Sequence, residues 1–261
     1  MQITAKILDA VKQSTQCLVV ACFEGSKLSA AASAINAADA KQLETLLKRE
    51  KFDGKAGQSL LLLNPQGIAA ERLLVIGFGA IDKQGSVSSE NFRKAVQKVP
   101  DTLKATHCSD LSIILGDLSV TGKDAEWQAR QTAEILIASQ HRADSLKSKP
   151  AEPSFVLKKV TLGVTKTTSA SAVKGIAIGQ AIAKGVDLAR ELGNLPGNVC
   201  TPTYLASEAK RLARGQTRLS VKVLEEKDMK ALGMGSLLSV SAGSDQPAKL
   251  IVMEYKGGNK K

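Results

Sequence analysis

The sequence predicts an α/β protein, with an N-terminal domain built on a mixed, largely parallel sheet flanked by helices. A long connecting helix and the beginning of a second α/β domain are expected to follow. Three observations support this fold class. Short apolar runs bounded by Gly, Pro or Asn alternate with amphipathic stretches. Hydrophobic residues make up 43% of the 261 residues and aromatic residues only 3%, so the core must be aliphatic. A cluster of helix breakers around Pro196 separates two helical patterns.

Residues 1–165 show this alternation most clearly and are assigned to the N-terminal domain. The run at 16–23 is apolar on both faces, which is typical of a strand in the middle of a sheet. Ser88 or Ser89 is expected to cap a helix that carries Glu90 in its first turn. The other apolar runs predict strands at 59–63, 72–78, 111–115 and 155–164, and helical spacing predicts helices at 38–51, 88–103 and 122–141.

A connecting segment is assigned to residues 166–193. It follows a charged, proline-containing stretch at 145–154, which marks either a boundary or a surface loop. The Ala-rich sequence predicts a helix over 169–192, with Gly193 as its C-cap and Pro196 preventing its continuation. The apolar positions available to its buried face are Val173, Ile176, Ala177, Ile182, Val186 and Leu188.

Residues 194–261 predict the start of a second domain. Thr201 and Pro202 are the residue types preferred at an N-cap and at the first helical position. A strand at 219–224, a short helix at 225–232 and an apolar strand at 249–255 are expected to follow. This order is that of an unfinished βαβ unit. The last strand is expected to lie inside a sheet with a neighbour on each edge.

Composition restricts the classes of function. No run reaches the roughly 18 apolar residues of a membrane span, and the N-terminus has no secretory pattern, so a cytoplasmic protein without membrane contact is expected.

The formal charge is +11, of which +3 falls in residues 1–150 and +8 in residues 151–261. An excess of this kind attracts phosphate backbones, and weak non-specific DNA binding stays an alternative. The scattered Lys and Arg are also explained by solvated helix faces.

The cysteines form no CxxC pair, and buried free thiols are expected. A zinc site that combined them with His107 and His141 is disfavoured, because a histidine and a cysteine adjacent in sequence cannot both converge on one metal without a special loop. The four cysteines are Cys17, Cys22, Cys108 and Cys200.

Two patterns suggest catalysis or cofactor binding, but each has a simpler explanation. Gly77 and Gly79 follow a strand as the first glycines of a dinucleotide fingerprint would, yet Asp82 stands at the third glycine position, so a tight turn is expected. Ser-x-x-Lys pairs have the spacing of a nucleophile and its base, but both fall on predicted amphipathic helices without a partner motif. These pairs are Ser171 with Lys174 and Ser207 with Lys210.

Two further groups of polar residues are explained by local structure. Glu225, Glu226 and Asp228 lie at the start of a predicted helix, where carboxylates interact favourably with the helix dipole. Asn194 and Asn198 flank Pro196, where asparagine typically bonds its own backbone in a turn. No catalytic, cofactor-binding or metal-ligating residue is therefore assigned on this chain.

The most specific segment is Arg190-Glu-Leu-Gly-Asn-Leu-Pro-Gly-Asn-Val-Cys-Thr-Pro-Thr-Tyr-Leu-Ala206. It resembles the NxPxN and TPxxLA motifs at the entry to the catalytic domain of leucyl (cytosol) aminopeptidases. The block at 231–255 is similar to the next landmark of that family. The resemblance implies an N-terminal α/β domain, a connecting helix and a catalytic domain that assembles into homo-hexamers.

The resemblance also implies a reaction. Family members remove N-terminal residues from peptides, with two divalent ions, Mn or Zn, that activate a water for attack on the scissile carbonyl. Their ligands are expected beyond the strand that ends at Tyr255, so residues 1–261 alone are expected to bind no metal pair and to be inactive. Three interpretations stay open: an aminopeptidase whose two-metal site lies beyond Lys261, a non-catalytic truncated form, and a basic DNA-binding protein.

Overall fold

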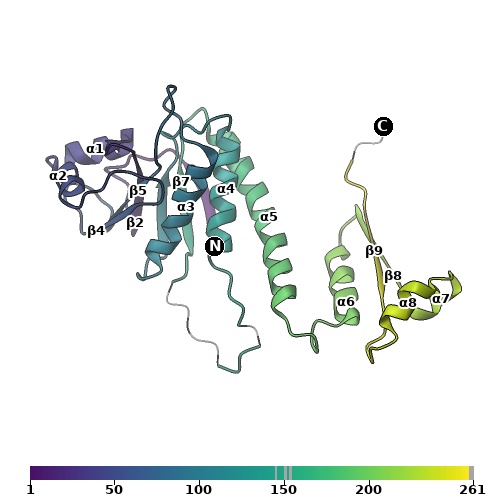
Figure 1. Cartoon of the computed structure of the whole chain (residues 1–261). Coiled ribbons are helices and arrows are strands. Elements are labelled where there is room, and N and C mark those ends of the chain that lie inside the picture. Colours follow the sequence, from purple (N-terminus) through teal and green to yellow (C-terminus); the bar gives the residue numbers. More distant parts are fainter. Residues whose placement is uncertain (145, 150–151, 153–154, 259–261) are drawn as a thin grey trace. The chain divides into compact units, whose positions relative to one another are not determined.

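The computed structural model describes residues 1–144, 146–149, 152 and 155–258. They form two compact units, Met1–Leu188 and Ala189–Lys261, which are considered separately below (Figure 1). Part of the predicted boundary at 145–154, namely residues 145, 150–151 and 153–154, lies outside the described residues. The division into domains at 165 and 193 stays a prediction. No helix in the described part of the chain is long and apolar enough to cross a membrane.

The first unit is built on a mixed sheet whose main path runs β1-β7-β6-β2-β5-β4, with the short β3 paired to β2. Four of its strand pairs are parallel, and only β4 with β5 and β3 with β2 are antiparallel. The predicted α/β class with a largely parallel sheet is confirmed. The strands are β1 Gln2–Lys6, β2 Cys17–Phe23, β3 Lys27–Leu28, β4 Ser59–Leu63, β5 Arg72–Gly77, β6 Asp110–Ile114 and β7 Lys159–Gly163.

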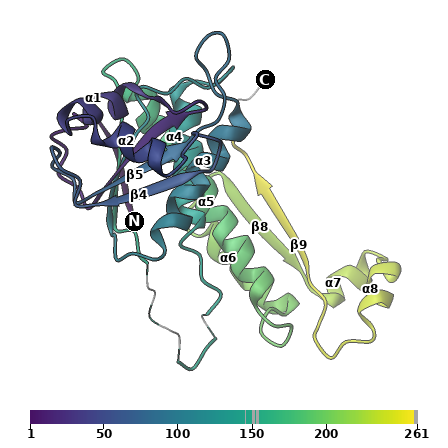
Figure 2. The same ribbon diagram turned by 60° about the vertical axis from the view of Figure 1, so that its left-hand side comes forward.

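Helices cover both faces of this sheet. The central strand β2 is buried on both sides because its side chains alternate between two hydrophobic cores. One core lies under α1 and α2, and the other under α3, α4 and α5 (Figures 1 and 2). The helices are α1 Ala30–Ala38, α2 Gln42–Arg49, α3 Ser89–Leu103, α4 Ala125–Ala138 and α5 Ser169–Asn194, of which the residues up to Leu188 belong to this unit.

Side-chain caps fix where several of these helices begin. The Ser88 hydroxyl accepts a hydrogen bond from the Asn91 N–H at 3.1 Å and starts α3, so the predicted cap is confirmed. The Asp124 carboxylate caps α4 through the Trp127 N–H, so this helix begins three residues after the predicted start at 122. The helix predicted at 38–51 is shorter, α2 Gln42–Arg49, because the chain turns before it and Lys41 has a positive φ of 63°.

Helix α5 packs on α4 through small side chains, so the predicted buried face was wrong in part. Val173, Ile182 and Val186 are 55%, 40% and 46% exposed. A Cβ on Gly175 would lie 2.1 Å from the carbonyl oxygen of Glu126, so the absent side chain is what allows the two backbones to approach. The residues that α5 buries are Ala172, Gly175, Ile176, Gly179 and Ala183.

The second unit contains the end of α5 and a two-stranded sheet. Gly193 was predicted as a C-cap, but it lies inside α5, which continues to Asn194 before Pro196 interrupts it. Thr201 caps the next helix by accepting from the Tyr204 N–H at 3.2 Å, as predicted. The elements are α6 Pro202–Ala213, β8 Leu219–Leu224, α7 Glu226–Ala231, α8 Gly235–Ser241 and β9 Leu250–Tyr255.

The expectation of a βαβ unit was wrong. Strands β8 and β9 pair antiparallel, with Leu219 opposite Tyr255 and Leu224 opposite Leu250. After α7 and α8 the chain begins β9 beside the end of β8. In a parallel pair it would have to cross back and begin β9 beside the start of β8. Within the part of the chain that the structure describes, β9 has β8 as its one neighbour, and Met253 and Tyr255 are 47% and 70% exposed.

Candidate functional site

The breaker segment that links α5 to α6 is a tight turn. The N–H groups of Val199 and Cys200 both bond the Pro196 carbonyl at 2.9 Å, and the Thr201 N–H bonds the Val199 carbonyl. Asn194 is the last residue of α5, and Asn198 is exposed on the turn. The residues that make this segment distinctive therefore set the direction in which α6 leaves the turn.

The three carboxylates at the start of α7 are held by neighbouring backbone and side-chain groups. Asp228 accepts a hydrogen bond from the Glu225 N–H at 3.0 Å, and Glu225 forms an ion pair with Lys249. Glu226 accepts from the Ala248 N–H at 2.8 Å. Each carboxylate thus contacts a different part of the unit. They stabilise the helix start and the approach to β9.

The described residues do not fit a two-metal centre. Nowhere in residues 1–144, 146–149, 152 and 155–258 do three or more His, Cys, Asp or Glu side chains gather so that they could hold a metal ion. Two bridged divalent ions about 4 Å apart need several such ligands together. A two-metal centre of this protein therefore needs ligands in addition to those that the described residues bring together.

Local contacts and surface exposure account for the two Ser-x-x-Lys pairs. The Glu126 carboxylate bonds the Lys174 ammonium at 2.9 Å and raises the pKa of that lysine, which keeps it protonated. The hydroxyl of Ser207 donates to the carbonyl of Thr203 in its own helix at 3.0 Å. Both serines and both lysines lie on the surface of their helices.

The glycines at the end of β5, Gly77 and Gly79, allow two backbone segments to approach closely. A Cβ on Gly77 would lie 2.2 Å from the carbonyl oxygen of Lys55, and Gly79 has a φ of 79°. The Gly79 N–H bonds the Gly54 carbonyl at 2.9 Å. Asp82, at the third position of the motif, accepts hydrogen bonds from the N–H groups of Gln84 and Ser86. A turn explains this segment, and it does not open into a phosphate-binding helix.

The cysteines and histidines do not converge on one point either. All four cysteines are free, and Cys17, Cys22 and Cys108 are buried as expected, whereas Cys200 is half-buried. His107 is exposed. The Nδ1 of His141 lies 2.6 Å from a carboxylate oxygen of Asp187, so this histidine ties the end of α4 to α5.

One groove in the first unit was not predicted from sequence. It has a volume of about 470 Å³ and lies at the carboxyl ends of β1, β6 and β7, the edge at which α/β sheets bind ligands. Its lining is largely apolar, with Asp117 and Lys166 among its few polar residues. One Asp117 carboxylate oxygen accepts from the Ala31 N–H of α1 at 2.8 Å. Residues 31 and 117 are far apart in sequence, and no local sequence pattern predicts their contact.

The second unit exposes several large apolar side chains. Its two-stranded sheet and the helices beside it present side chains that a folded domain normally buries. Single exposed apolar residues are common, but here they recur just after α7, on α8 and on β9. They are Leu232, Leu237, Val240, Val252, Met253 and Tyr255, between 41% and 87% exposed.

The fold places the chain in a known class of structure. It matches a tomato leucine aminopeptidase mutant with a TM-score of 0.80 and 23% identity, over 100% of this chain and 52% of that one. It also matches the bottromycin maturation enzyme BotP in complex with Mn, with a TM-score of 0.69 and 23% identity, over 92% of this chain and 45% of that one. The architecture is that of the leucine aminopeptidases.

Sequence comparison gives the family. Residues 19–150 match the N-terminal domain of the cytosol aminopeptidase family, and residues 187–261 match its catalytic domain. The chain belongs to the cytosol aminopeptidase family, which confirms the resemblance of the 190–206 segment. Members are metal-dependent aminopeptidases, and thus hydrolases.

Curated relatives are similar along the whole chain. The chain is 43% identical over 260 residues to the cytosol aminopeptidase of Pseudomonas aeruginosa and 44% identical over 260 residues to a probable cytosol aminopeptidase of Azotobacter vinelandii. Each alignment covers 100% of this chain and 52% of the relative. The chain therefore spans about half the length of the curated relatives it matches.

Proposed function

We propose that this chain is part of an aminopeptidase that removes N-terminal residues from peptides, and that sequence other than residues 1–261 supplies its metal ligands. The observation that carries the proposal is the match of the chain, in order, to the N-terminal and catalytic domains of one peptidase family. Identity of 43% to the Pseudomonas aeruginosa enzyme extends over the whole chain. The expected ions are a pair of Mn²⁺ or Zn²⁺, which would activate the attacking water.

The second unit supports this division of roles. Two of its carboxylates accept backbone hydrogen bonds, Asp228 at the start of α7 and Glu226 at the approach to β9. Its exposed apolar side chains and the free edge of β9 suit contact with further polypeptide. In this proposal the unit forms one part of a larger catalytic domain. Residues 1–261 contribute a framework to that domain, and they contribute no group that reacts with the substrate.

The test is complementation. A preparation of this chain verified at 27.5 kDa is assayed for hydrolysis of leucine amide with Mn²⁺ or Zn²⁺. It is assayed alone, mixed with the part of the Pseudomonas aeruginosa enzyme outside the aligned region, and fused to that part. We expect turnover from the fusion and from the mixture, and none from the chain alone. Turnover by the 261 residues alone would place the active site among residues assigned structural roles here. An inactive fusion beside an active Pseudomonas enzyme would refute the proposed role of the chain.

A matched pair of variants tests which surface of the chain contacts the added polypeptide. Met253→Lys places a charge on exposed β9 of the second unit, and Leu63→Lys places one on exposed β4 of the first unit. Both replace an exposed apolar strand residue by lysine. We expect Met253→Lys to reduce activity recovered on mixing and Leu63→Lys to leave it unchanged.

The proposal extends to assembly and location. A homo-hexamer of the complete enzyme and a cytoplasmic setting are proposed from the family. Weak non-specific DNA binding is a second candidate, supported by the balance of +8 over residues 151–261.

A further inference from the structure

The groove at the carboxyl ends of β1, β6 and β7 has the size of a small-molecule site. Its volume of about 470 Å³ lies within the range of about 300–1,000 Å³ that is usual for such sites. The segments that follow the three strands meet there beside the start of α1. Ligands commonly bind at this edge of an α/β sheet, because the rigid strands position the loops that contact the ligand.

Much of the groove's lining is aliphatic. Gly163, the last residue of β7, has no side chain, and a Cβ there would lie 2.7 Å from Cδ1 of Ile114 and 3.2 Å from Cδ1 of Leu8. These two side chains therefore lie directly against the β7 backbone, and both line the groove. Ile7 also lines the groove and is 67% exposed. A ligand with an aliphatic side chain would remove this apolar surface from water.

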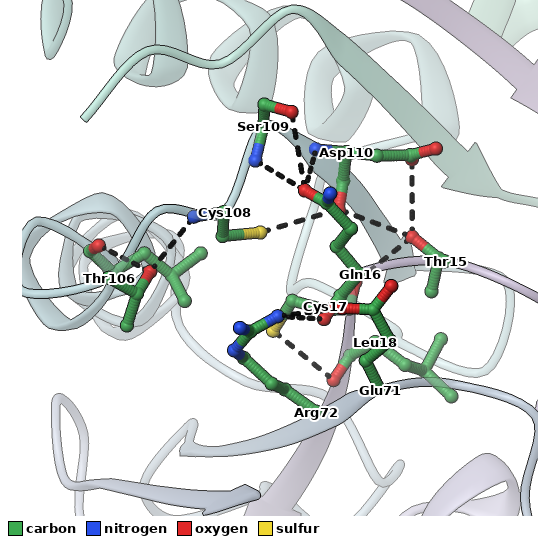
Figure 3. Close-up of polar contacts among 11 residues, drawn as sticks. Thr15, Gln16, Cys17, Leu18, Glu71, Arg72, Thr106, Cys108, Ser109 and Asp110 are labelled. Carbon is green, nitrogen blue, oxygen red and sulfur yellow. Dashed lines mark hydrogen bonds and ion pairs between the residues drawn. The ribbon is translucent and has the colours of Figure 1, made fainter. Parts of the chain in front are cut away.

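The polar groups at the opposite, amino-terminal edge of the sheet bond one another. Asp110, the first residue of β6, accepts from the Thr15 hydroxyl at 3.2 Å through one carboxylate oxygen and from the Lys159 ammonium at 2.8 Å through the other. The side-chain oxygen of Gln16 accepts from the N–H groups of Ser109 and Asp110 (Figure 3). Both oxygens of the Asp110 carboxylate thus have partners within the protein, and this cluster joins neighbouring strands without a ligand.

Asp117, beyond the other end of β6, differs from Asp110. One of its carboxylate oxygens accepts from the Ala31 N–H of α1 at 2.8 Å, which holds the side chain beside the groove. The other oxygen, Oδ1, is buried, and no donor in the described part of the chain bonds it. A buried carboxylate oxygen without a donor is costly, and it indicates a partner that the protein itself does not supply. An ammonium group of a ligand in the groove would be such a partner.

Lys166 brings the opposite charge to the same groove. It lies in the turn after β7 and is exposed. Within the ranges that the structure describes, its ammonium takes part in no ion pair. Asp117 and Lys166 are the charged residues of the groove's lining. The groove therefore offers one negative and one positive group beside an aliphatic surface.

We propose that this groove binds a free α-amino acid with a branched aliphatic side chain, such as leucine. The ammonium of the ligand pairs with Asp117, its carboxylate pairs with Lys166, and its side chain covers the aliphatic lining. A molecule with only one of the two charges leaves one of these partners unpaired, and a smaller side chain buries less apolar surface. An aminopeptidase releases molecules of this class, but the site is inferred from the groove alone. An absence of binding would therefore leave the proposed function intact.

Isothermal titration calorimetry of the 261-residue protein tests the proposal with leucine and three analogues. Isoamylamine lacks the carboxylate of leucine, isocaproate lacks its ammonium, and alanine lacks most of its side chain. We expect one leucine per chain with a Kd below about 1 mM, and binding of each analogue that is at least about ten-fold weaker. Absence of leucine binding, or equal affinity for isoamylamine or isocaproate, would overturn the proposal.

Charge variants test the two ionic contacts. Asp117→Asn keeps an oxygen for the Ala31 N–H and removes the negative charge, and Lys166→Gln removes the positive charge. Each should weaken leucine binding at least about ten-fold. Their matched controls are Asp110→Asn and Lys158→Gln, at the amino-terminal ends of β6 and β7, and these should bind leucine as the native protein does. Equal affinity in all four variants would show that the ligand does not use Asp117 and Lys166.

Filling the groove gives a second test that leaves both charges in place. Ala34 of α1 is exposed and lines the groove, whereas its neighbour Ser33 is exposed and lies outside the lining. Ala34→Phe should abolish leucine binding, and Ser33→Phe should not. The Tm of each variant without ligand checks that the fold is intact. Leucine binding of unchanged affinity in folded Ala34→Phe would place the ligand elsewhere and refute the assignment of this groove.

Discussion

Replacing Gly175 by alanine tests the contact between α4 and α5 that organises one face of the first unit. The added Cβ would lie 2.1 Å from the Glu126 carbonyl oxygen, 2.9 Å from its carbon and 3.1 Å from the Arg130 nitrogen. All three are backbone atoms, so no flexible side chain can move aside. The helices must separate by more than 1 Å to restore ordinary contact distances of about 3.4 Å or more.

Two effects of opposite sign set the change in the free energy of unfolding caused by Gly175→Ala. Overpacking a well-packed contact costs about 1–3 kcal/mol, occasionally more. Alanine in place of glycine inside a helix gains about 1 kcal/mol. A clash of 2.1 Å with a backbone atom belongs at the upper end of the first range, so we expect the free energy of unfolding to fall by about 2 kcal/mol. Gly185→Ala is the matched control in the same helix. Nothing lies within 4 Å of its added Cβ, and this variant should gain about 0.5–1 kcal/mol.

Urea unfolding followed by tryptophan fluorescence measures both variants. Trp127 is the single tryptophan of the chain and lies on α4, with its ring 5.5 Å from the Phe92 ring between centroids. Its signal therefore reports on the first unit. A shift of the unfolding midpoint at constant m-value isolates the change in stability. Equal stabilisation by Gly175→Ala and Gly185→Ala would show that the helices do not approach as closely as described.

Two further predictions concern charge. The Ser86 N–H and the Thr121 hydroxyl lower the pKa of Asp82 below its usual 3.8, so its ionised form stabilises the fold above that pH and the contribution is lost as the pH falls through the lowered value. Asp82→Asn should therefore destabilise the protein at neutral pH. The difference between the urea midpoints of the variant and the native protein should shrink as the pH falls below 3.8. DNA affinity, measured by anisotropy with two unrelated duplexes, should be weak, equal for both and steeply reduced by salt, because the positive charge is diffuse. Tight binding to one duplex at high salt would reveal a specific surface.

The sequence was most informative about strands formed by a single apolar run. β2, β4, β5 and β8 match the predicted strands within one residue at each end, because breakers bound each apolar run. β1 was missed because it lies at the edge of the sheet and buries only Ile3 among its five residues. α1 was missed because its run of alanines has no clear polar face.

Pairings between distant segments could not be predicted from local patterns. The antiparallel direction of β8 and β9 depends on how the chain between them turns, and apolar periodicity carries no information about that direction. The groove beside Asp117 joins residues from separate strands and loops. The contact of Gly175 with α4 could not be predicted for a related reason. In sequence, a glycine inside a helix indicates only a lower helix propensity until the element packed against it is known.

The apolar side chains on β9 and α8 also bear on how the protein behaves at high concentration. A free strand edge beside exposed apolar groups is a template for association with another copy. The formal charge of +11 opposes that association through long-range repulsion, which works best at low ionic strength. At 0.15 M salt the electrostatic repulsion extends only about 8 Å. The short-range attraction between exposed strand edges and apolar side chains then dominates. Salt and concentration therefore act together on the colloidal state of this chain, and dilute, low-salt buffers favour dispersed copies.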